Sequence, residues 1–385
     1  MNENRPRLST LLAQGGVRRG DPTGAISTPI YQSATFSHLE YGVSTGYDYS
    51  RTSNPTRRVV ETLIAAAESG DGGFAFASGM AAVTAVLLLY RQGDHMVVCD
   101  DLYGGTYRVL EQNFRQFGLE ATYVDFADLS AVEAAIIPGR SRAILLETPT
   151  NPLMKVSDIA AVAEIARSRG LHLIVDNTFC TPVLQRPLEL GADIVIHSAS
   201  KYLAGHNDVI AGVVVTASRE LSERVGFVQN STGSILGPQD SWLLLRGMKT
   251  LALRMEAQQR GALRLAHWLS EHPAVREVYY PGLPDHPGTE VHGRQASGGG
   301  GMLSFRVTDA AAVPSIINRL DLIIFAESLG GVETLLTHPV RQTHADIPPE
   351  VRERIGVTED LLRLSVGIEA PEDLIADLEN ALPSA

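Results

Sequence analysis

The segment with the sequence ADIVIHSASK, Ala192–Lys201, changes character halfway along its length. Its apolar, β-branched first half predicts a buried strand, whereas its second half contains small hydroxyl residues and a lysine. A lysine at the end of a buried strand is costly unless its amine takes part in binding or chemistry. Upstream, the apolar run Leu171–Val175 ends on Asp176, so two expected strands deliver an acid and an amine. We expect both groups at one edge of an open α/β sheet, where ligands bind.

Length, charge and cysteine content restrict the class of protein. A chain of 385 residues is too long for one simple core and predicts two domains. The net charge of -12 argues against nucleic acid or an anionic membrane as a partner. Cys99 and Cys180 end apolar runs and are expected to be buried free thiols, which fits a reducing compartment. Because neither a signal-length nor a membrane-spanning apolar stretch is present, we expect a cytoplasmic protein.

Strand and helix signals alternate over residues 51–240 and predict a mostly parallel sheet with helices on both faces. Residues 1–50 are rich in Gly, Ser, Thr and Pro and predict an extended N-terminal arm. The strands are expected at Phe74–Ala77, His95–Cys99, Ala121–Val124, Ala143–Leu146, Leu171–Val175, Ile194–His197 and Gly212–Thr216, and the helices at Arg57–Ser69, Thr106–Phe117, Asp158–Arg169 and Glu220–Gln229.

The pattern changes near Asp240, where one long helical stretch begins and runs to about Glu271. Gly247 and Gly261 are the points at which this stretch could kink or divide. Apolar runs at Met302–Val307 and Leu322–Phe325 predict strands of a smaller α+β domain. The expected division is therefore an arm at 1–50, a large domain at 51–240 and a small domain at 241–385.

The paired acid and amine are what pyridoxal phosphate (PLP) requires. Lys201 would supply the Schiff-base amine, and burial would favour its reactive, uncharged form; the alternative is a solvated surface lysine. Asp176 would keep the pyridine nitrogen protonated, whereas the alternative is a turn or helix-capping residue. Tyr103 follows a strand and precedes a helix, so it could stack on a planar cofactor or simply belong to the core.

Groups for the phosphate and for a substrate carboxylate are also present. The run Ser78–Met80 opens a helix, whose first backbone N–H groups can bind a phosphate, with the hydroxyls of Ser198 and Ser200 beside it. Ordinary N-capping by Ser78 is the alternative. The planar fork of Arg51 suits a phosphate, although a surface turn would also explain it. Arg363 is a charge inside an apolar strand, which a substrate carboxylate or an internal salt bridge would pair.

Together these residues lie in motifs that resemble the transsulfuration family, the Cys/Met-metabolism enzymes that use PLP. The resemblance covers nearly the whole chain and implies the aspartate-aminotransferase-like fold, known as fold type I. The motifs are YSRTSNPT (Tyr49–Thr56), ASGMA (Ala77–Ala81), DLYGGT (Asp101–Thr106), ETPTNP (Glu147–Pro152), VDNTF (Val175–Phe179), HSASKYLAG (His197–Gly205), AESLGGVET (Ala326–Thr334) and RLSVGIE (Arg363–Glu369).

The resemblance implies a catalytic or cofactor-binding role for each candidate. Lys201 would carry PLP and move protons among the substrate carbons, Asp176 would hold the ring nitrogen and Tyr103 would stack on the ring. Tyr49 and Arg51 would reach the phosphate site of a neighbouring subunit, and Tyr49 is also a candidate co-base. This implies a homodimer as the catalytic unit and a homotetramer built from two dimers. The further cofactor-binding residues would be Ser78, Gly79, Met80, Ser198 and Ser200.

For the amino-acid substrate, the resemblance implies that Arg363 binds the α-carboxylate with Asn151 and Ser328 close by. Arg108 and Glu327 would lie near the distal end of the substrate, and no metal is expected. Glu327 resembles the acid of cystathionine γ-synthases and γ-lyases, because β-lyases often carry an apolar or aromatic residue there.

The stretches Ser44–Arg57, Asp240–Thr250 and Gln342–Pro348 resemble bacterial cystathionine γ-synthase and O-acetylhomoserine thiolyase sequences most. The first expectation is therefore γ-replacement, in which an O-acylhomoserine and cysteine give cystathionine. The alternatives, in order, are cystathionine γ-lyase and then O-acetylhomoserine thiolyase or methionine γ-lyase. The last is weakened because those enzymes tend to have cysteine where this chain has Gly105.

Other classes fit the sequence less well. A nicotinamide oxidoreductase should carry Gly-x-Gly-x-x-Gly after its first strand, and a P-loop enzyme should carry Gly-Lys-Ser/Thr; neither motif is present. A non-catalytic homologue would be expected to have lost Lys201 or Asp176, and both are retained.

Overall fold

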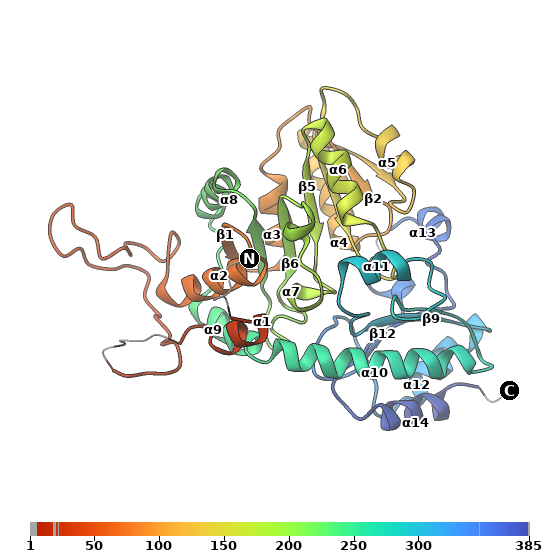
Figure 1. The fold of residues 1–385 in the computed structure, drawn as a ribbon. Helices are drawn as coiled ribbons and strands as arrows, with labels where there is room; N and C mark the ends of the chain where they lie inside the picture. The colour runs from red at the N-terminus through yellow and green to blue at the C-terminus, as the bar shows by residue number, and fades with distance from the viewer. Residues whose placement is uncertain (1–5, 18–20, 22, 346, 384–385) are drawn as a thin grey trace.

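The computed structural model of the chain describes residues 6–17, 21, 23–345 and 347–383. Parts of the predicted arm (1–5, 18–20 and 22) and one residue of the Gln342–Pro348 stretch therefore lie outside the described residues. The described chain forms two sheets, each with helices packed on it (Figure 1). The larger sheet has seven strands in the order β1-β7-β6-β5-β4-β2-β3. They are β1 (Gly72–Phe76), β2 (His95–Cys99), β3 (Glu120–Val124), β4 (Ser141–Glu147), β5 (His172–Asp176), β6 (Ile194–Ser198) and β7 (Gly212–Thr216).

The larger sheet is mostly parallel, as predicted. Strands β3, β2, β4, β5 and β6 run parallel to one another, and β7 pairs antiparallel with both β6 and β1. The carboxyl ends of β4, β5 and β6 therefore meet at one edge. Helices cover both faces of the sheet and contribute to two buried clusters. The first contains residues of α3 (Gly79–Leu87), α6 (Ile159–Arg169) and α8 (Arg219–Thr232), and the second contains residues of α2 (Pro55–Ala67) and α9 (Pro238–Met248).

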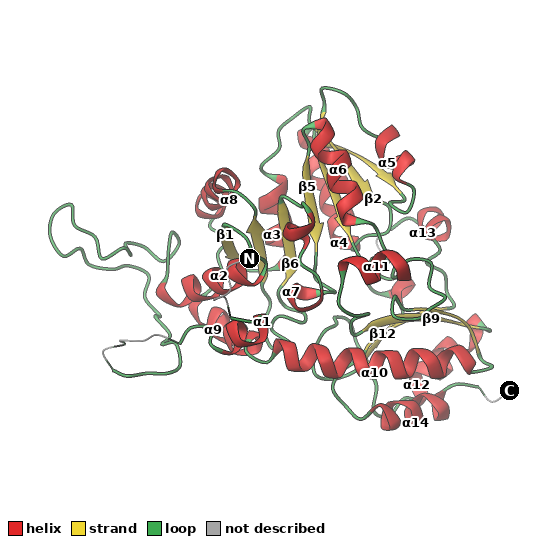
Figure 2. Cartoon of the chain, in the orientation of Figure 1, coloured by secondary structure: helices red, strands yellow, loops and turns green. Residues whose placement is uncertain are grey.

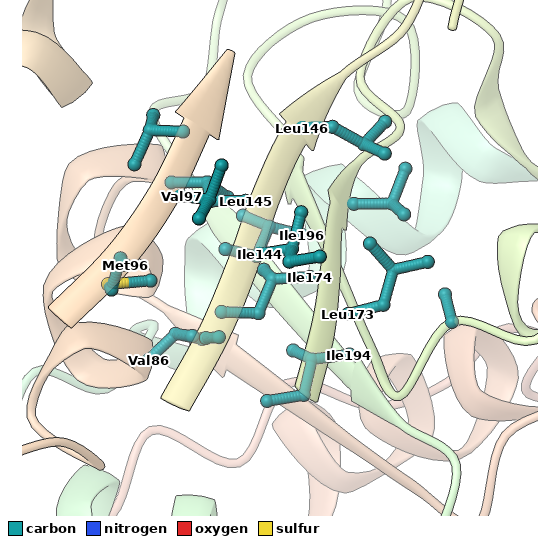
Figure 3. Close-up of a cluster of buried hydrophobic side chains, with 14 of the residues drawn as sticks. Val86, Met96, Val97, Ile144, Leu145, Leu146, Leu173, Ile174, Ile194 and Ile196 are labelled. Carbon is teal, nitrogen blue, oxygen red and sulfur yellow. The ribbon is translucent and has the colours of Figure 1, made fainter. Parts of the chain in front are cut away.

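Burial on both faces explains why the central strands read as nearly continuous apolar runs. Figure 3 shows Met96 and Val97 of β2, Ile144–Leu146 of β4, and Leu173 and Ile174 of β5 gathered with Ile194 and Ile196 of β6 in one cluster. Cys99 and Cys180 are both buried and free, as predicted. No helix in the described part of the chain is long and apolar enough to cross a membrane.

The smaller sheet has five strands in the order β10-β11-β12-β9-β8. Helix α10 (Leu251–Glu271) packs on it together with α12 (Val313–Arg319) and α14 (Pro371–Ala381), and the three helices lie along one side of the sheet in Figure 2. The strands are β8 (Val275–Tyr279), β9 (Met302–Val307), β10 (Ile324–Phe325), β11 (Leu335–Thr337) and β12 (Leu361–Ser365).

Several predicted elements differ in the structure. The long helix expected from Asp240 divides after Met248, between α9 and α10, and not at either glycine. Gly247 instead permits a close approach, because a Cβ there would lie 2.1 Å from the Ala204 carbonyl oxygen. The helix expected at Thr106–Phe117 is a short α4 (Gly104–Arg108) followed by a π-helical turn (η1, Val109–Phe114) and a 3₁₀ turn (η2, Arg115–Phe117).

The N-terminal arm is not extended throughout, since α1 (Leu8–Ala13) forms within it and buries Leu12. The strand expected at Leu322–Phe325 shortens to the two residues of β10. The remaining elements are α5 (Leu129–Ala134), α7 (Thr181–Leu184), α11 (Thr289–Gln295), α13 (Pro349–Ile355) and the 3₁₀ turns η3 (Pro187–Leu190), η4 (Ala310–Ala312) and η5 (Pro339–Arg341).

Candidate active site

A cavity of about 790 Å³ lies where the carboxyl ends of β4, β5 and β6 meet residues of the smaller sheet. Its size suits a cofactor together with a small substrate. It brings together most of the residues that the sequence singled out. Those lining it are Ser78, Gly79, Met80, Tyr103, Asn151, Asp176, Ser198, Ser200, Lys201, Glu327, Ser328 and Arg363.

Lys201 follows β6 and points its amine at the smaller sheet, where Nζ donates a 2.8 Å hydrogen bond to Ser328 Oγ. Burial, and then the nearby Arg363 guanidinium, lower the pKa of Lys201 to about 8, whereas Glu327 acts in the opposite direction. The uncharged amine is therefore accessible near neutral pH, as a nucleophile or base requires. Ser328 has a φ of 93°, an uncommon backbone conformation for a residue with a side chain.

Asp176 ends β5, where its Oδ1 accepts bonds from the Thr178 backbone N–H (3.0 Å) and from Thr178 Oγ1 (2.5 Å). The local turn considered as an alternative is therefore present, but the side chain also lines the cavity. Burial raises the pKa of Asp176, while the bonds from Thr178 and the nearby His197 lower it. A carboxylate in this position is stabilised by a cation in the cavity, such as a protonated pyridine nitrogen.

The start of α3 lies against the end of β6 and provides the donors expected for a phosphate. Ser78 is the N-cap of α3, with its Oγ accepting from the Ala81 N–H at 3.0 Å. A Cβ at Gly79 would lie 2.9 Å from Ser198 Oγ, so only glycine leaves this corner open. The Ser200 hydroxyl is engaged with the Ala211 backbone, donating to its carbonyl at 3.2 Å and accepting from its N–H at 2.9 Å.

Arg363 is buried in β12, and its hydrogen-bond partners are neutral groups. It donates to Asn151 Oδ1 (2.7 Å), to the Ser328 carbonyl (2.9 Å) and to Thr337 Oγ1 (3.1 Å), while its Nε has no partner among the described residues. Burial lowers the pKa of Arg363 to about 10. Within the described chain no carboxylate forms an ion pair with this guanidinium, so the internal salt bridge considered from the sequence is not formed. A buried cation of this kind suits a carboxylate ligand.

Three predicted site residues do not line this cavity. Tyr49 and Arg51 lie on the arm, whose loop projects from the body of the chain on the left of Figure 1. Arg51 Nη1 donates to the Asn230 carbonyl at 2.7 Å and to Asn230 Oδ1 at 3.1 Å. Arg108 ends α4.

Glu147 also lines the cavity, although sequence reasoning did not single it out. It ends β4, pairs with Asp176 in the sheet and accepts a 3.0 Å bond from the Tyr103 N–H through Oε2. Burial, and then the neighbouring Asp176, raise the pKa of Glu147 well above its ordinary value. The signal was available, because Glu147 ends an apolar run in the same way as Asp176 does.

The residues of the cavity fit PLP. The amine, the acid and the helix N-terminus lie in one hollow, and the Tyr103 ring lies against Gly105, where a Cβ would stand 2.4 Å from it. Among the described residues, no group of three or more His, Cys, Asp or Glu side chains could hold a metal ion.

This fold and this site define a fold type I PLP-dependent enzyme. The model of a protein family described as "Cys/Met metabolism PLP-dependent enzyme" matches residues 9–383 of the chain. The chain belongs to this family, and its cofactor is PLP.

Curated relatives extend over nearly the whole chain. It is 54% identical to the cystathionine gamma-lyase of Bacillus subtilis (strain 168), covering 98% of this chain and 99% of that protein. It is 51% identical to the cystathionine gamma-synthase/O-acetylhomoserine (thiol)-lyase of the same strain (97% and 96% covered). It is 50% identical to the cystathionine beta-lyase of Lactococcus lactis subsp. cremoris (strain MG1363), with 97% and 98% covered.

Among solved structures, the cystathionine gamma-lyase of Lactobacillus plantarum complexed with L-serine superposes with a TM-score of 0.94, at 49% identity and with 98% of each chain covered. The family is thus a transsulfuration family, in which close relatives carry the names of different reactions.

Proposed function

We propose that the protein is a cystathionine γ-lyase, which converts cystathionine and water to cysteine, 2-oxobutanoate and ammonia. The observation that carries this proposal is the placement of Arg363 and Glu327 in the cavity, close enough for both to change the pKa of Lys201. Cystathionine carries a carboxylate and an amino group at each end. Arg363 suits the proximal carboxylate, and Glu327 suits the distal ammonium.

When bound, PLP supplies the electron sink that lets a proton leave the substrate Cα. The protein residues do the rest. Lys201, whose pKa is lowered to about 8, is the base that takes the proton from Cα and then a second proton from Cβ, before the thiol leaves Cγ. Asp176 holds the ring nitrogen, and Arg363 fixes the carboxylate so that Cα lies beside the amine.

γ-Synthase is the second candidate, although the sequence motifs put it first. The same cavity would bind cysteine through Glu327 and an O-acylhomoserine through Arg363. We place the γ-lyase first because the chain is 54% identical to the γ-lyase relative and 51% identical to the γ-synthase relative. The solved γ-lyase structure also covers 98% of the chain. Methionine γ-lyase fits less well, since a side chain at Gly105 would displace the Tyr103 ring.

A side-by-side assay of the PLP-loaded protein decides between the γ-lyase and γ-synthase reactions. We expect release of 2-oxobutanoate and cysteine from cystathionine to exceed formation of cystathionine from O-acetyl- or O-succinylhomoserine plus cysteine. Faster condensation would replace the proposal by the γ-synthase. Pyruvate as the main keto acid would show β-elimination and would contradict both the γ-lyase and the γ-synthase assignment.

Glu327→Gln tests the distal contact directly. Loss of one charge-assisted hydrogen bond should raise KM for cystathionine about 10- to 100-fold. Homocysteine, which lacks the distal ammonium, is the matched control, and its KM should change much less in the same variant. Equal changes for the two substrates would show that Glu327 does not bind the distal end.

We also propose a homodimer as the catalytic unit, with dimers pairing into a tetramer. The projecting arm supports this, because Tyr49 is half-exposed and Arg51 contacts Asn230 away from the cavity of its own chain. A second copy would bring these two residues to the phosphate end of its neighbour's site, where a planar cation suits the ligand.

A further inference from the structure

A buried polar cluster lies behind the active site, outside the cavity. Glu68 caps the end of α2, and its Oε1 lies 2.6 Å from Nε2 of His197 in β6. The same oxygen accepts from Asn177 Nδ2 at 3.0 Å, and Gln185 Nε2 donates to Asn177 Oδ1 at 3.0 Å. All four side chains are buried, and Glu68 Oε2 and His197 Nδ1 have no partner among the described residues.

This cluster is joined to both chemical groups of the site through the backbone. Asn177 directly follows Asp176, and His197 lies in the strand that leads to Lys201. Along β6, Ile196 and Ser198 line the cavity. Val195 and Ala199 instead belong to the core that β6 shares with α2. Because side chains alternate along a strand, His197 stands on the face opposite the cavity.

Burial of two titratable groups is expensive, and neutral hydrogen-bonding residues of similar size would fill this space at less cost. Among the described residues, the pair acts electrostatically on Asp176 at the end of β5 and on Cys180 at the start of α7. His197 lowers the pKa of Asp176, and Glu68 adds to the effect of burial in raising the pKa of the Cys180 thiol. His197 is therefore the member of the pair that acts on Asp176.

We propose that Glu68 and His197 are positioning residues for the cofactor: their buried, hydrogen-bonded pair fixes the ends of β5 and β6, so that Asp176 and Lys201 are held in place for PLP. The inference rests on the proposed role of Asp176 toward PLP. It is independent of the choice between lyase and synthase.

The test is the double variant Glu68→Gln/His197→Gln. It keeps hydrogen-bonding side chains in the cluster but removes both titratable groups, so the fold should keep a Tm close to that of the wild type. The readouts are the Kd of the apoprotein for PLP and the low-pH limit of PLP binding, both followed by absorbance. We expect Kd to rise about tenfold and the low-pH limit to move up by about one pH unit, because Asp176 protonates more readily.

His95→Gln is the matched control. His95 is another buried histidine, bonded to Ser141 Oγ (2.8 Å) and Thr122 Oγ1 (2.9 Å) at the amino end of β2. This variant should lower Tm and leave both PLP readouts unchanged. If the double variant also leaves them unchanged, the cluster is only structural and the proposal fails. Should the double variant not fold, Glu68→Gln alone decides by the same readouts, since the amide oxygen that it introduces can still accept from Asn177.

Discussion

Lys201 combines a buried amine with a cationic neighbour, and this has a consequence for stability as well as for chemistry. Its pKa is about 8 in the folded chain, against 10.5 when solvated. Below pH 8, folding must therefore bury a proton-bearing amine that the unfolded chain would keep in water. This cost is complete below pH 8, falls as the pH rises from 8 to 10.5, and is absent above 10.5, where both states are neutral.

Lys201→Met should therefore stabilise the PLP-free protein while preventing covalent attachment of the cofactor. We expect the free energy of unfolding at pH 7 to increase by roughly 2–3 kcal/mol, and the gain to shrink towards pH 10.5. Urea unfolding of both apoproteins at equal concentration, at pH 7 and pH 10, measures it. A variant less stable than the wild type at pH 7 would contradict the assignment.

Lys155→Met is a control of opposite sign. Lys155 Nζ lies 2.8 Å from Asp125 Oδ2 and 3.4 Å from Asp100 Oδ1. Although burial opposes them, these bonds raise the pKa of Lys155. Its removal should lower the free energy of unfolding. Opposite effects of the two substitutions would distinguish the reactive amine of Lys201 from the ion-paired amine of Lys155.

At the scale of elements, α10 joins the two sheets. Its first turn, with Leu251 and Met255, packs in the core of the larger sheet, whereas Leu265 and Leu269 pack in that of the smaller one. The division at residues 240 and 241 stays a proposal. It falls within α9, which packs with α2 in the core of the larger sheet.

Arg254 of α10 fixes the segment that follows Lys201. Its guanidinium donates to the carbonyls of Tyr202 (2.7 Å) and Gly247 (2.9 Å), and burial lowers its pKa to about 10. Arg254→Met removes the donor of the buried Tyr202 carbonyl, whereas the Gly247 carbonyl still accepts from the Thr250 N–H at 3.2 Å. We therefore expect a loss of about 3 kcal/mol in unfolding free energy and weaker PLP retention.

Arg260→Met provides the comparison on the same helix. The Arg260 side chain is exposed, and its ion-pair partner among the described residues is Glu256, one turn away. Its removal should change stability by less than about 0.5 kcal/mol. Denaturant unfolding and PLP titration of both variants measure the difference; equal effects would show that α10 does not position the lysine segment through Arg254.

The elements that could be predicted from the sequence are those with a clear hydrophobic pattern and those that end on a charged residue. The strands of the larger sheet stand out because both faces are buried, and Asp176 and Lys201 stand out because they interrupt such runs. Strand β8 was missed because most of its side chains are half-exposed or exposed, and β11 because it has three residues. The π-helical turn at Val109–Phe114 is set by packing and leaves no local signal.

The same limit applies to the site. Arg363 could be identified as a cation in an apolar strand, but its contact with Asn151 joins the two sheets and has no expression in local sequence. Glu68 and His197 are 129 residues apart and meet only in the folded chain. A single charged residue at the end of an apolar strand can be identified from the sequence. A pair of residues that are far apart in the sequence and meet only in the folded chain cannot.

At the scale of the whole molecule, the projecting arm leads to a testable prediction about how two copies of the chain assemble. If Arg51 completes the site of a neighbour, Lys201→Met and Arg51→Ala homodimers should each be impaired for a different reason. In a hybrid dimer, one site carries both substitutions. The other site combines an intact Lys201 from one chain with an intact Arg51 from its partner.

Mixing the two variants under conditions that allow subunit exchange should therefore restore activity. Random exchange makes half of the dimers hybrid, with one intact site in two, so recovery should approach about a quarter of wild-type activity. Differently tagged chains confirm that hybrids form, and each variant incubated alone is the control. If tagged hybrids form but activity stays at the sum of the parents, Arg51 serves its own chain, and the contact with Asn230 is then its working position. Recovery would instead show that this contact is one that the arm leaves when a second copy docks.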